Sequence, residues 1–289
     1  MKVSNGISSY NSLFEKLLSE LVLPPEQHPR FKIKKLYHLT GMERGKTIVA
    51  LFKRFTRIDK LKVLDVGCGS GGISVAFADE GAHVVSIDLN KNYTRITKVR
   101  ACEKKVHLDV VYADACSSPF GEGTFDILVC NDVVEHISKV NKFFSEVGRL
   151  LKPDGLAFIE THNRFSPDII LSDPHSGLPL VVLLPKRVAD SVVRRWSGLE
   201  NSLFYNATYL DLVKKLDKNG IEIFFVDLQA YLKEAKTPHT RLSPSSLTQK
   251  LMGKARELFI PLIDFWIKNI YVRLFIPGWR LVGRKKNRN

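Results

Sequence analysis

The chain has 289 residues, of which 44% are hydrophobic and 26% charged, with a formal net charge of +14. This length and composition are those of a folded globular protein with one large domain or two small ones. The four cysteines lie far apart without a Cys-x-x-Cys pair, which disfavours a zinc site or a disulfide framework. The N-terminal stretch lacks the features of a signal peptide, so we expect a cytoplasmic protein.

The positive charge is concentrated near the C-terminus. Residues 231–289 contain thirteen Lys and Arg but three acidic residues, a net charge of +10, so the first 230 residues carry only +4. Such asymmetry indicates an anionic partner, such as a membrane surface, nucleic acid or a phosphorylated substrate. A solvated basic tail is the alternative.

The hydrophobic pattern predicts two N-terminal helices, at residues 10–23 and 42–55. Apolar strands then alternate with amphipathic helices. The strands are expected at 62–67, 83–89, 108–115, 125–132 and 156–163, and the helices at 72–81, 92–105 and 140–155. A helix at 207–220, a strand at 221–229 and a segment at 278–286 that could pair beside it follow. This alternation predicts an α/β fold with a mostly parallel sheet covered on both faces.

We divide the chain into four parts. Residues 1–58 form an N-terminal helical cap, 59–163 a ligand-binding core, 164–206 an insertion, and 207–289 the rest of the core with a second insertion at about 235–276. Both insertions combine apolar runs with basic residues. Asp264, Lys268 and Arg273 interrupt the second one, which disfavours a membrane-spanning helix. An amphipathic helix at a membrane interface, or a helical lid, fits better.

The stretch "VLDVGCGSGG", residues 63–72, places a glycine loop after the first strand of the core. Its spacing satisfies the dinucleotide pattern GxGxxG, which is a weak signal alone, and a P-loop is excluded because no Gly-Lys-Ser/Thr follows. Asp88 ends the next strand, where a carboxylate can accept hydrogen bonds from both ribose hydroxyls. Asp65 and Asp114 would have no role in an NAD-dependent dehydrogenase. Three acids on successive strands instead suit S-adenosylmethionine, which has an adenosine and a charged amino acid moiety.

The successive motifs "VLDVGCGSGG", "VVSIDLN", "VVYADACSSPF", "FDILVCNDVVEHI" and "GRLLKPDGLAFIETHN" resemble those of class I S-adenosylmethionine-dependent methyltransferases. The resemblance covers residues 61–163. It implies a Rossmann-like, doubly wound sheet of seven strands, mostly parallel, with an antiparallel last strand and helical insertions.

The resemblance also implies a set of donor-binding residues. Gly67, Gly69 and Gly71 would pack against the methionine moiety, and Asp65 would support the loop and the amino group. Asp88 would bind the ribose, Leu89 and Ala115 would contact the adenine, Asp114 would read its edge, and Asn131 would lie near the sulfonium. Two simpler roles remain open: local loop support for Asp65, and a turn or helix cap for Asp114.

Methyl transfer from a sulfonium requires alignment, and an oxygen acceptor also benefits from a general base. Candidate bases follow the fourth and fifth strands: Asp132, Glu135, His136, Glu160, His162 and Asn163. His162 is the best placed, although a single loop hydrogen bond is the alternative. The group Asp132, Glu135 and His136 resembles a stretch that can hold a divalent metal in quinone-pathway O-methyltransferases. Relatives without metal share Glu-His here, and we expect none.

The acceptor is the least constrained part of the prediction. "NDVVEH" differs from the Asn/Asp-Pro-Pro-aromatic stretch that clamps a flipped base, so a nucleic-acid acceptor is disfavoured. We expect O-methylation of a small or lipid-linked acceptor, with an anionic membrane surface as a candidate partner and a peripheral location there. Methylation of RNA or protein, and a non-catalytic module that binds S-adenosylmethionine, are the alternatives. Arg44, before the core, could pair with the donor's carboxylate or be exposed.

Overall fold

The computed structural model describes residues 12–27, 30–173, 175–197, 207–227, 276 and 278–287. The chain divides into two compact units. Unit 1 comprises Met1–Val129 and Arg149–Gly155, and unit 2 comprises Cys130–Gly148 and Leu156–Asn289. Apart from residue 276, the second predicted insertion lies outside the described residues, so its amphipathic character stays a prediction.

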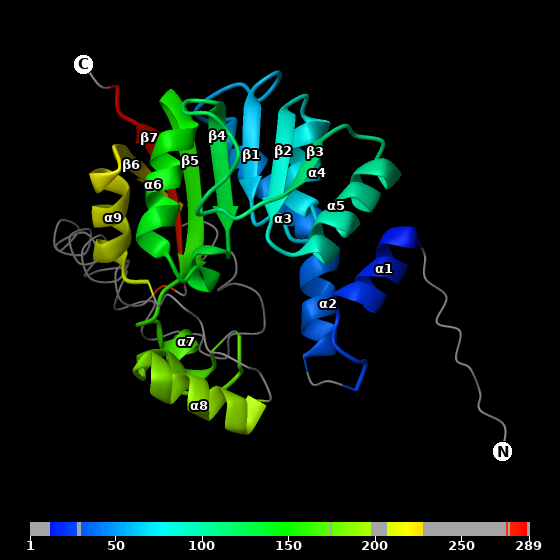
Figure 1. Ribbon diagram of the computed structural model, residues 1–289, viewed down its shortest axis with the longest axis vertical. Helices are drawn as coiled ribbons and strands as arrows, with labels where there is room; N and C mark the ends of the chain where they lie inside the picture. The colour runs from blue at the N-terminus through cyan, green and yellow to red at the C-terminus, as the bar shows by residue number, and fades with distance from the viewer. Residues whose placement is uncertain are drawn as a thin grey trace, which may run out of the picture. The chain divides into compact units, whose positions relative to one another are not determined.

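Within the described residues, seven strands form one sheet in the order β3-β2-β1-β4-β5-β7-β6 (Figure 1). They are β1 (Lys62–Val66), β2 (His83–Asp88), β3 (Asp109–Tyr112), β4 (Phe125–Asn131), β5 (Leu151–His162), β6 (Ile221–Val226) and β7 (Gly278–Lys285). The first three pair in parallel, and β7 pairs antiparallel with both β5 and β6. The expected doubly wound α/β sheet with an antiparallel last strand is confirmed.

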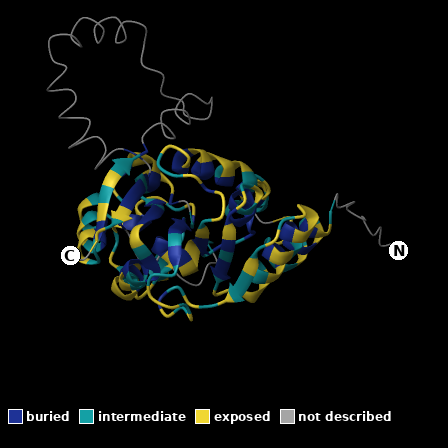
Figure 2. Cartoon of the chain, turned by 90° about the horizontal axis from the view of Figure 1, so that it is seen from above, coloured by how far each residue is buried: buried dark blue, intermediate teal, exposed yellow. Residues whose placement is uncertain are grey.

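The helices of unit 1 are α1 (Leu13–Leu21), α2 (Phe31–Leu39), α3 (Gly41–Phe52), α4 (Gly72–Asp79) and α5 (Lys91–Glu103). Those that lie mainly or wholly in unit 2 are η1 (Val134–His136), α6 (Val140–Leu150), α7 (Pro167–Leu171), η2 (Val181–Leu183), α8 (Lys186–Ser197) and α9 (Tyr209–Lys218). In β4 every residue but one is buried, as expected for a strand covered on both faces. Figure 2 shows such buried positions in dark blue, with exposed positions along the outer sides of the helices.

In unit 1, helices α3 and α4 pack closely against each other at glycine residues. A Cβ added at Gly72, the first residue of α4, would lie only 2.3 Å from the carbonyl carbon of Gly41. A Cβ at Gly45, one turn further along α3, would lie 2.7 Å from the Cβ of Ala76. The two backbones therefore approach so closely that neither glycine leaves room for a side chain.

Two local predictions differ from the structure. Helix α2 has no counterpart in the prediction, because Ile33 and Leu36 are exposed and lysines interrupt the apolar pattern. Helix α6 ends at Leu150, and the Pro-Asp-Gly that was expected to end it lies inside β5. There Asp154 adopts a left-handed φ of 61°.

Candidate active site

The glycine loop, residues 67–72, joins β1 to α4 in unit 1. Gly67, Gly69 and Gly71 have φ angles of 67°, 52° and 75°, a region that glycine occupies at little cost. A Cβ at Gly71 would lie 2.7 Å from Cγ2 of Thr97, whereas one at Gly69 would have Gly67 O, 4.0 Å away, as its nearest neighbour. The loop is therefore packed against α5 at Gly71 and open at Gly69, where a ligand can approach the backbone.

Two carboxylates support this loop. Asp88, at the end of β2, accepts hydrogen bonds from the backbone N–H groups of Gly69 at 3.0 Å and Asn90 at 2.8 Å. Asp65 is buried in β1 and accepts a hydrogen bond from the hydroxyl of Ser74 at 2.5 Å. Burial raises the pKa of both carboxyls, that of Asp65 to about 6. Asp65 therefore holds the first turn of α4, directly after the loop, and its contact with the donor stays a prediction.

The residues expected around the adenine lie after β2 and β3. Leu89 is 63% exposed, so its side chain is free to cover a flat ring. Asp114 is exposed, and its Oδ1 accepts a hydrogen bond from the N–H of Cys116 at 2.8 Å, which is the turn role considered for it. Ala115, which lies between Asp114 and Cys116 in the sequence, is half-buried.

At the end of β4 in unit 2, the backbone is strained. Asp132 has a φ of 53°, and its N–H donates to the carbonyl of Glu160 at 3.1 Å. Asn131 donates from Nδ2 to Asp132 Oδ2 at 2.9 Å, while its own Oδ1 is buried without a hydrogen-bond partner among the described residues. Strain of this kind in a residue other than glycine is typical of functional sites.

A histidine–glutamate pair lies next to this strained turn. His162, the last residue of β5, places Nδ1 2.8 Å from Oε1 of the buried Glu135. The hydroxyl of Thr161 donates to the other carboxylate oxygen at 3.0 Å. Burial alone would lower the pKa of His162 and raise that of Glu135. Their mutual interaction outweighs it, so the pKa of His162 rises to about 9 and that of Glu135 falls.

A protein family described as "Methyltransferase domain" matches residues 64–159 of the chain. The ubiquinone biosynthesis O-methyltransferase of Pseudomonas aeruginosa is 31% identical over 166 residues, which cover 53% of this chain and 70% of that protein. The chain belongs to the class I S-adenosylmethionine-dependent methyltransferases.

Other relatives of this methyltransferase match over shorter stretches. The ubiquinone biosynthesis O-methyltransferase of Bartonella tribocorum is 38% identical over 108 residues, covering 37% of this chain and 43% of that protein. The chain thus spans about half the length of several curated relatives. The crystal structure of an S-adenosylmethionine-dependent methyltransferase from Mesorhizobium loti has the same fold. Its TM-score is 0.53 at 16% identity, over 84% of this chain and all 100% of that one.

The donor of this family, S-adenosylmethionine, suits the residues of this methyltransferase. The open backbone at Gly69 offers a cradle that a Cβ would fill. The exposed Leu89, in the same unit, offers an apolar surface. None of the helices in the described part of this methyltransferase is long and apolar enough to cross a bilayer.

The groups that could hold a metal in this methyltransferase differ from those in the sequence pattern. Ligand atoms of Asp132, Glu135 and His162 lie within 4.8 Å of one another. His136, the third residue of that sequence pattern and a candidate base, is exposed, with its ring centroid 5.4 Å from that of His175. With its pKa raised to about 9, His162 is protonated at neutral pH and offers no lone pair at Nδ1. His162 and Glu135 form an ion pair beside Asp132, and the expectation that these residues hold no metal stays a prediction.

The other candidate residues have structural partners. Glu160 pairs with Arg280 at 2.9 Å, and Asn163 donates to the carbonyl of Ile276 at 2.9 Å. Arg44 donates to the carbonyl of Tyr37 at 2.7 Å and stacks on its ring. Neither the Glu160 contact nor the Asn163 contact points to a role in proton transfer, and pairing of Arg44 with the donor's carboxylate stays a prediction.

Two residues of α5 that were not predicted as site residues hold the glycine loop. The hydroxyl of Thr97 donates to the carbonyl of Gly69 at 2.9 Å, and Nη1 of Arg100 donates to the carbonyl of Ser70 at 3.0 Å. Both side chains are buried, in the same stripe of α5 as Ile96 and Ala101. A polar residue within an otherwise apolar helical stripe was the signal that could have identified them.

Proposed function

We propose that this protein transfers a methyl group from S-adenosylmethionine to an oxygen of a small or lipid-linked acceptor. The observation that carries the proposal is the His162–Glu135 pair, in which a buried carboxylate holds an imidazole at 2.8 Å. This arrangement is that of a general base with its orienting group. The names of the curated relatives, which are O-methyltransferases of ubiquinone biosynthesis, support oxygen as the acceptor atom.

When bound, S-adenosylmethionine supplies a methyl group that its positively charged sulfur has already activated. The chain then has to hold the donor, align the acceptor and exclude water. We assign donor binding to the residues that the sequence predicts: Asp65, Gly67, Gly69, Gly71, Asp88, Leu89, Asp114, Ala115 and Asn131. The open side of the loop at Gly69 supports this assignment.

His162 takes the proton of the acceptor hydroxyl in this proposal. Glu135 engages Nδ1, which leaves Nε2 to accept the proton as the hydroxyl oxygen bonds to the methyl carbon and the carbon–sulfur bond breaks. Glu135 remains ionised and stabilises the imidazolium that forms. Because the pKa of His162 is raised to about 9, only its neutral fraction can act, and the rate should rise with pH toward that value.

The test is transfer of labelled methyl groups to catechol-type phenols and to lipid extracts. We expect His162→Gln to lower kcat by about 10²- to 10⁴-fold and to remove the rise of the rate toward pH 9. His107→Gln, at an exposed histidine in unit 1, is the matched control and should leave the rate unchanged. A His162→Gln enzyme with the wild-type rate and pH profile would refute His162 as the base.

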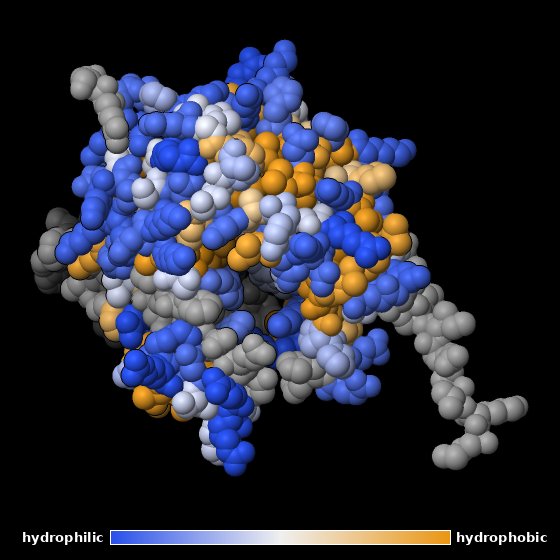
Figure 3. Space-filling view, in the orientation of Figure 1, coloured by the Kyte–Doolittle hydropathy of each residue, from blue (hydrophilic) through white to orange (hydrophobic). Residues whose placement is uncertain are grey.

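We also propose that the insertion after β5 contacts an anionic membrane surface. Its apolar side chains include Leu171, Leu180 and Trp196, which are 69%, 55% and 76% exposed. Helix α8 adds four basic residues: Lys186, Arg187, Arg194 and Arg195. Exposed apolar side chains beside basic ones are typical of interfacial binding. Figure 3 shows hydrophobic areas among the mostly hydrophilic residues of one face of this protein.

Sedimentation with vesicles tests this second proposal. We expect binding to vesicles that contain anionic phosphatidylglycerol but weak binding to phosphatidylcholine alone, with Trp196→Ala weakening it. Leu210→Ala, at a 51% exposed position of α9, is the control. Equal binding of wild type and Trp196→Ala would exclude this surface, and salt-sensitive binding to RNA instead would favour a nucleic-acid acceptor.

A further inference from the structure

Arg100 is a buried cation beside the glycine loop that has no assigned contact with the donor. It lies on α5 and is only 4% exposed, yet its guanidinium donates hydrogen bonds at both ends. Burial lowers its pKa to about 10, so the side chain is still protonated at neutral pH. A buried charge needs several hydrogen bonds to offset the loss of water, and the partners of Arg100 therefore show what it holds.

One end of the guanidinium holds the glycine loop. Nη1 donates to the carbonyl of Ser70 at 3.0 Å and lies 3.2 Å from its hydroxyl. Three residues earlier on the same face of α5, Thr97 holds the carbonyl of Gly69. Helix α5 thus fixes two consecutive carbonyls of a loop whose glycines have left-handed backbone angles.

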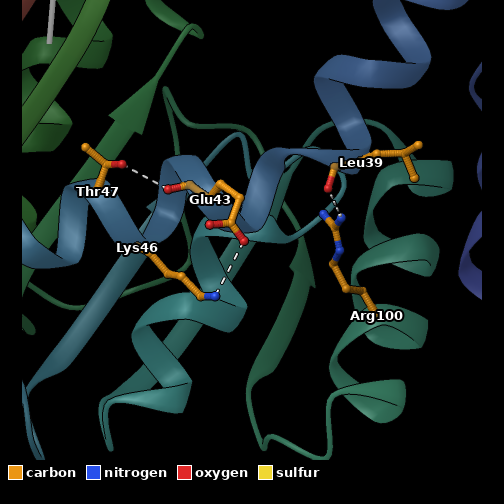
Figure 4. Close-up of polar contacts among 5 residues, drawn as sticks. All are labelled: Leu39, Glu43, Lys46, Thr47 and Arg100. Carbon is orange, nitrogen blue, oxygen red and sulfur yellow. Dashed lines mark hydrogen bonds and ion pairs between the residues drawn. The ribbon is translucent and has the colours of Figure 1, made fainter. Parts of the chain in front are cut away.

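The other end holds the N-terminal cap helices. Nη2 donates to the carbonyls of His38 at 2.9 Å and Leu39 at 3.4 Å, which are at the C-terminus of α2. Figure 4 shows the contact with Leu39. The last carbonyls of a helix lie at the negative end of its dipole, and a cation stabilises this end. The guanidinium also lies 4.1 Å from the ring centroid of Phe14 in α1.

A second contact joins the same two parts. Nδ1 of the buried His38 lies 3.2 Å from the hydroxyl of Ser70. Burial, with the nearby charges of Arg44 and Arg100, lowers the pKa of His38 to about 4, so this ring is neutral at pH 7 and Nδ1 can accept a hydrogen bond from the hydroxyl. The helix α2, the loop and α5 therefore meet at Ser70.

We propose that Arg100 is a positioning residue that couples the seating of cap helices α1 and α2 to donor binding at the glycine loop. The inference rests on the proposed donor role of that loop. Since coupling between two sites is reciprocal, a seated cap strengthens donor binding and a bound donor protects the cap. An arginine is needed here because the two Nη groups of its guanidinium donate to the loop and to the end of α2 at once, whereas the single ammonium group of a lysine could not reach both.

The test compares Arg100→Met with Arg95→Met, at an exposed position of the same helix. For Arg100→Met we expect the KM for S-adenosylmethionine and the Kd for S-adenosylhomocysteine to rise by about 5- to 150-fold, the usual range of coupling. We expect kcat at saturating donor to change little. In the wild type, S-adenosylhomocysteine should slow amide hydrogen exchange across residues 31–39, and in Arg100→Met this protection should be lost. Arg95→Met should behave as wild type.

A milder variant covers the case in which Arg100→Met does not fold. Ser70→Ala keeps the guanidinium and removes only the hydroxyl shared by Arg100 and His38. It should weaken S-adenosylhomocysteine binding severalfold and reduce the protection of residues 31–39. Wild-type protein that binds S-adenosylhomocysteine without protecting these residues would overturn the coupling and leave the donor site standing. Wild-type protein that does not bind it would overturn both.

Discussion

At the scale of single residues, burial of the Asp65 carboxyl lowers the stability of the folded protein at neutral pH. Its pKa is raised from 3.8 to about 6, mainly by burial, so the folded protein binds this proton more tightly than the unfolded chain does. The protonated Asp65 carboxyl therefore contributes to the free energy of unfolding below about pH 4, and this contribution is lost as the pH rises through about 6. Above that pH the ionised carboxylate opposes folding by an amount on the order of 3 kcal/mol.

Asp65→Asn should therefore stabilise the protein at pH 7.5 by roughly 1–3 kcal/mol and flatten its stability between about pH 4 and 6. The same change should weaken binding of S-adenosylhomocysteine if Asp65 faces the donor's amino group. Urea unfolding at both pH values measures the first effect and calorimetry the second. Asp79→Asn, at an exposed position of α4, is the control. Equal destabilisation of Asp65→Asn at pH 4 and 7.5 would contradict this account of the buried carboxyl.

At the scale of elements, the contact of α3 with α4 depends on Gly72, the last residue of the glycine loop motif. In Gly72→Ala the new Cβ would meet the backbone of Gly41 at 2.3 Å, and backbone atoms cannot give way as a flexible side chain can. We expect a loss of at least about 1–3 kcal/mol in the free energy of unfolding.

Gly121→Ala is the matched control, because the nearest atom to its new Cβ is Oγ1 of Thr124 at an ordinary 3.5 Å. Its stability should stay within about 1 kcal/mol of wild type. Urea unfolding compares the two variants. If Gly72→Ala is as stable as Gly121→Ala, the packing of α3 on α4 is looser than the structure shows.

The elements of the core could be predicted because their signals are local. Strands β1, β2 and β4 are apolar runs because strands that are buried on both faces need apolar side chains. The loop that follows β1 has glycines at fixed positions because its backbone angles favour glycine. Helix α2 could not be predicted, since its apolar side chains are exposed and its C-terminal end depends on Arg100, 61 residues away. Likewise, the position of His162 pointed to chemistry, but its partner Glu135 lies on another element.

At the scale of the whole molecule, the sequence analysis identified the family and the donor but left the acceptor open. The donor motifs are short and occur in a fixed order. All of the proposed donor-binding residues except Asn131 fall in unit 1. The proposed base pair and the insertion after β5 belong to unit 2. Acceptor recognition depends on such insertions, whose residues follow no common sequence spacing. Much of the positive charge falls in residues 231–289, most of which the structure does not describe.

The central claim is that the glycine loop and Asp88 form the donor site of a methyltransferase. Calorimetric titration with S-adenosylhomocysteine, of wild type and Asp88→Ala, tests it most directly. Asp109→Ala, at the opposite end of the neighbouring strand β3, is the control. We predict micromolar binding by wild type and by the control, and a loss of about 2 kcal/mol or more in Asp88→Ala, as expected when hydrogen bonds to a charged group are removed. Absence of binding by wild type, or wild-type affinity in Asp88→Ala, would contradict the claim.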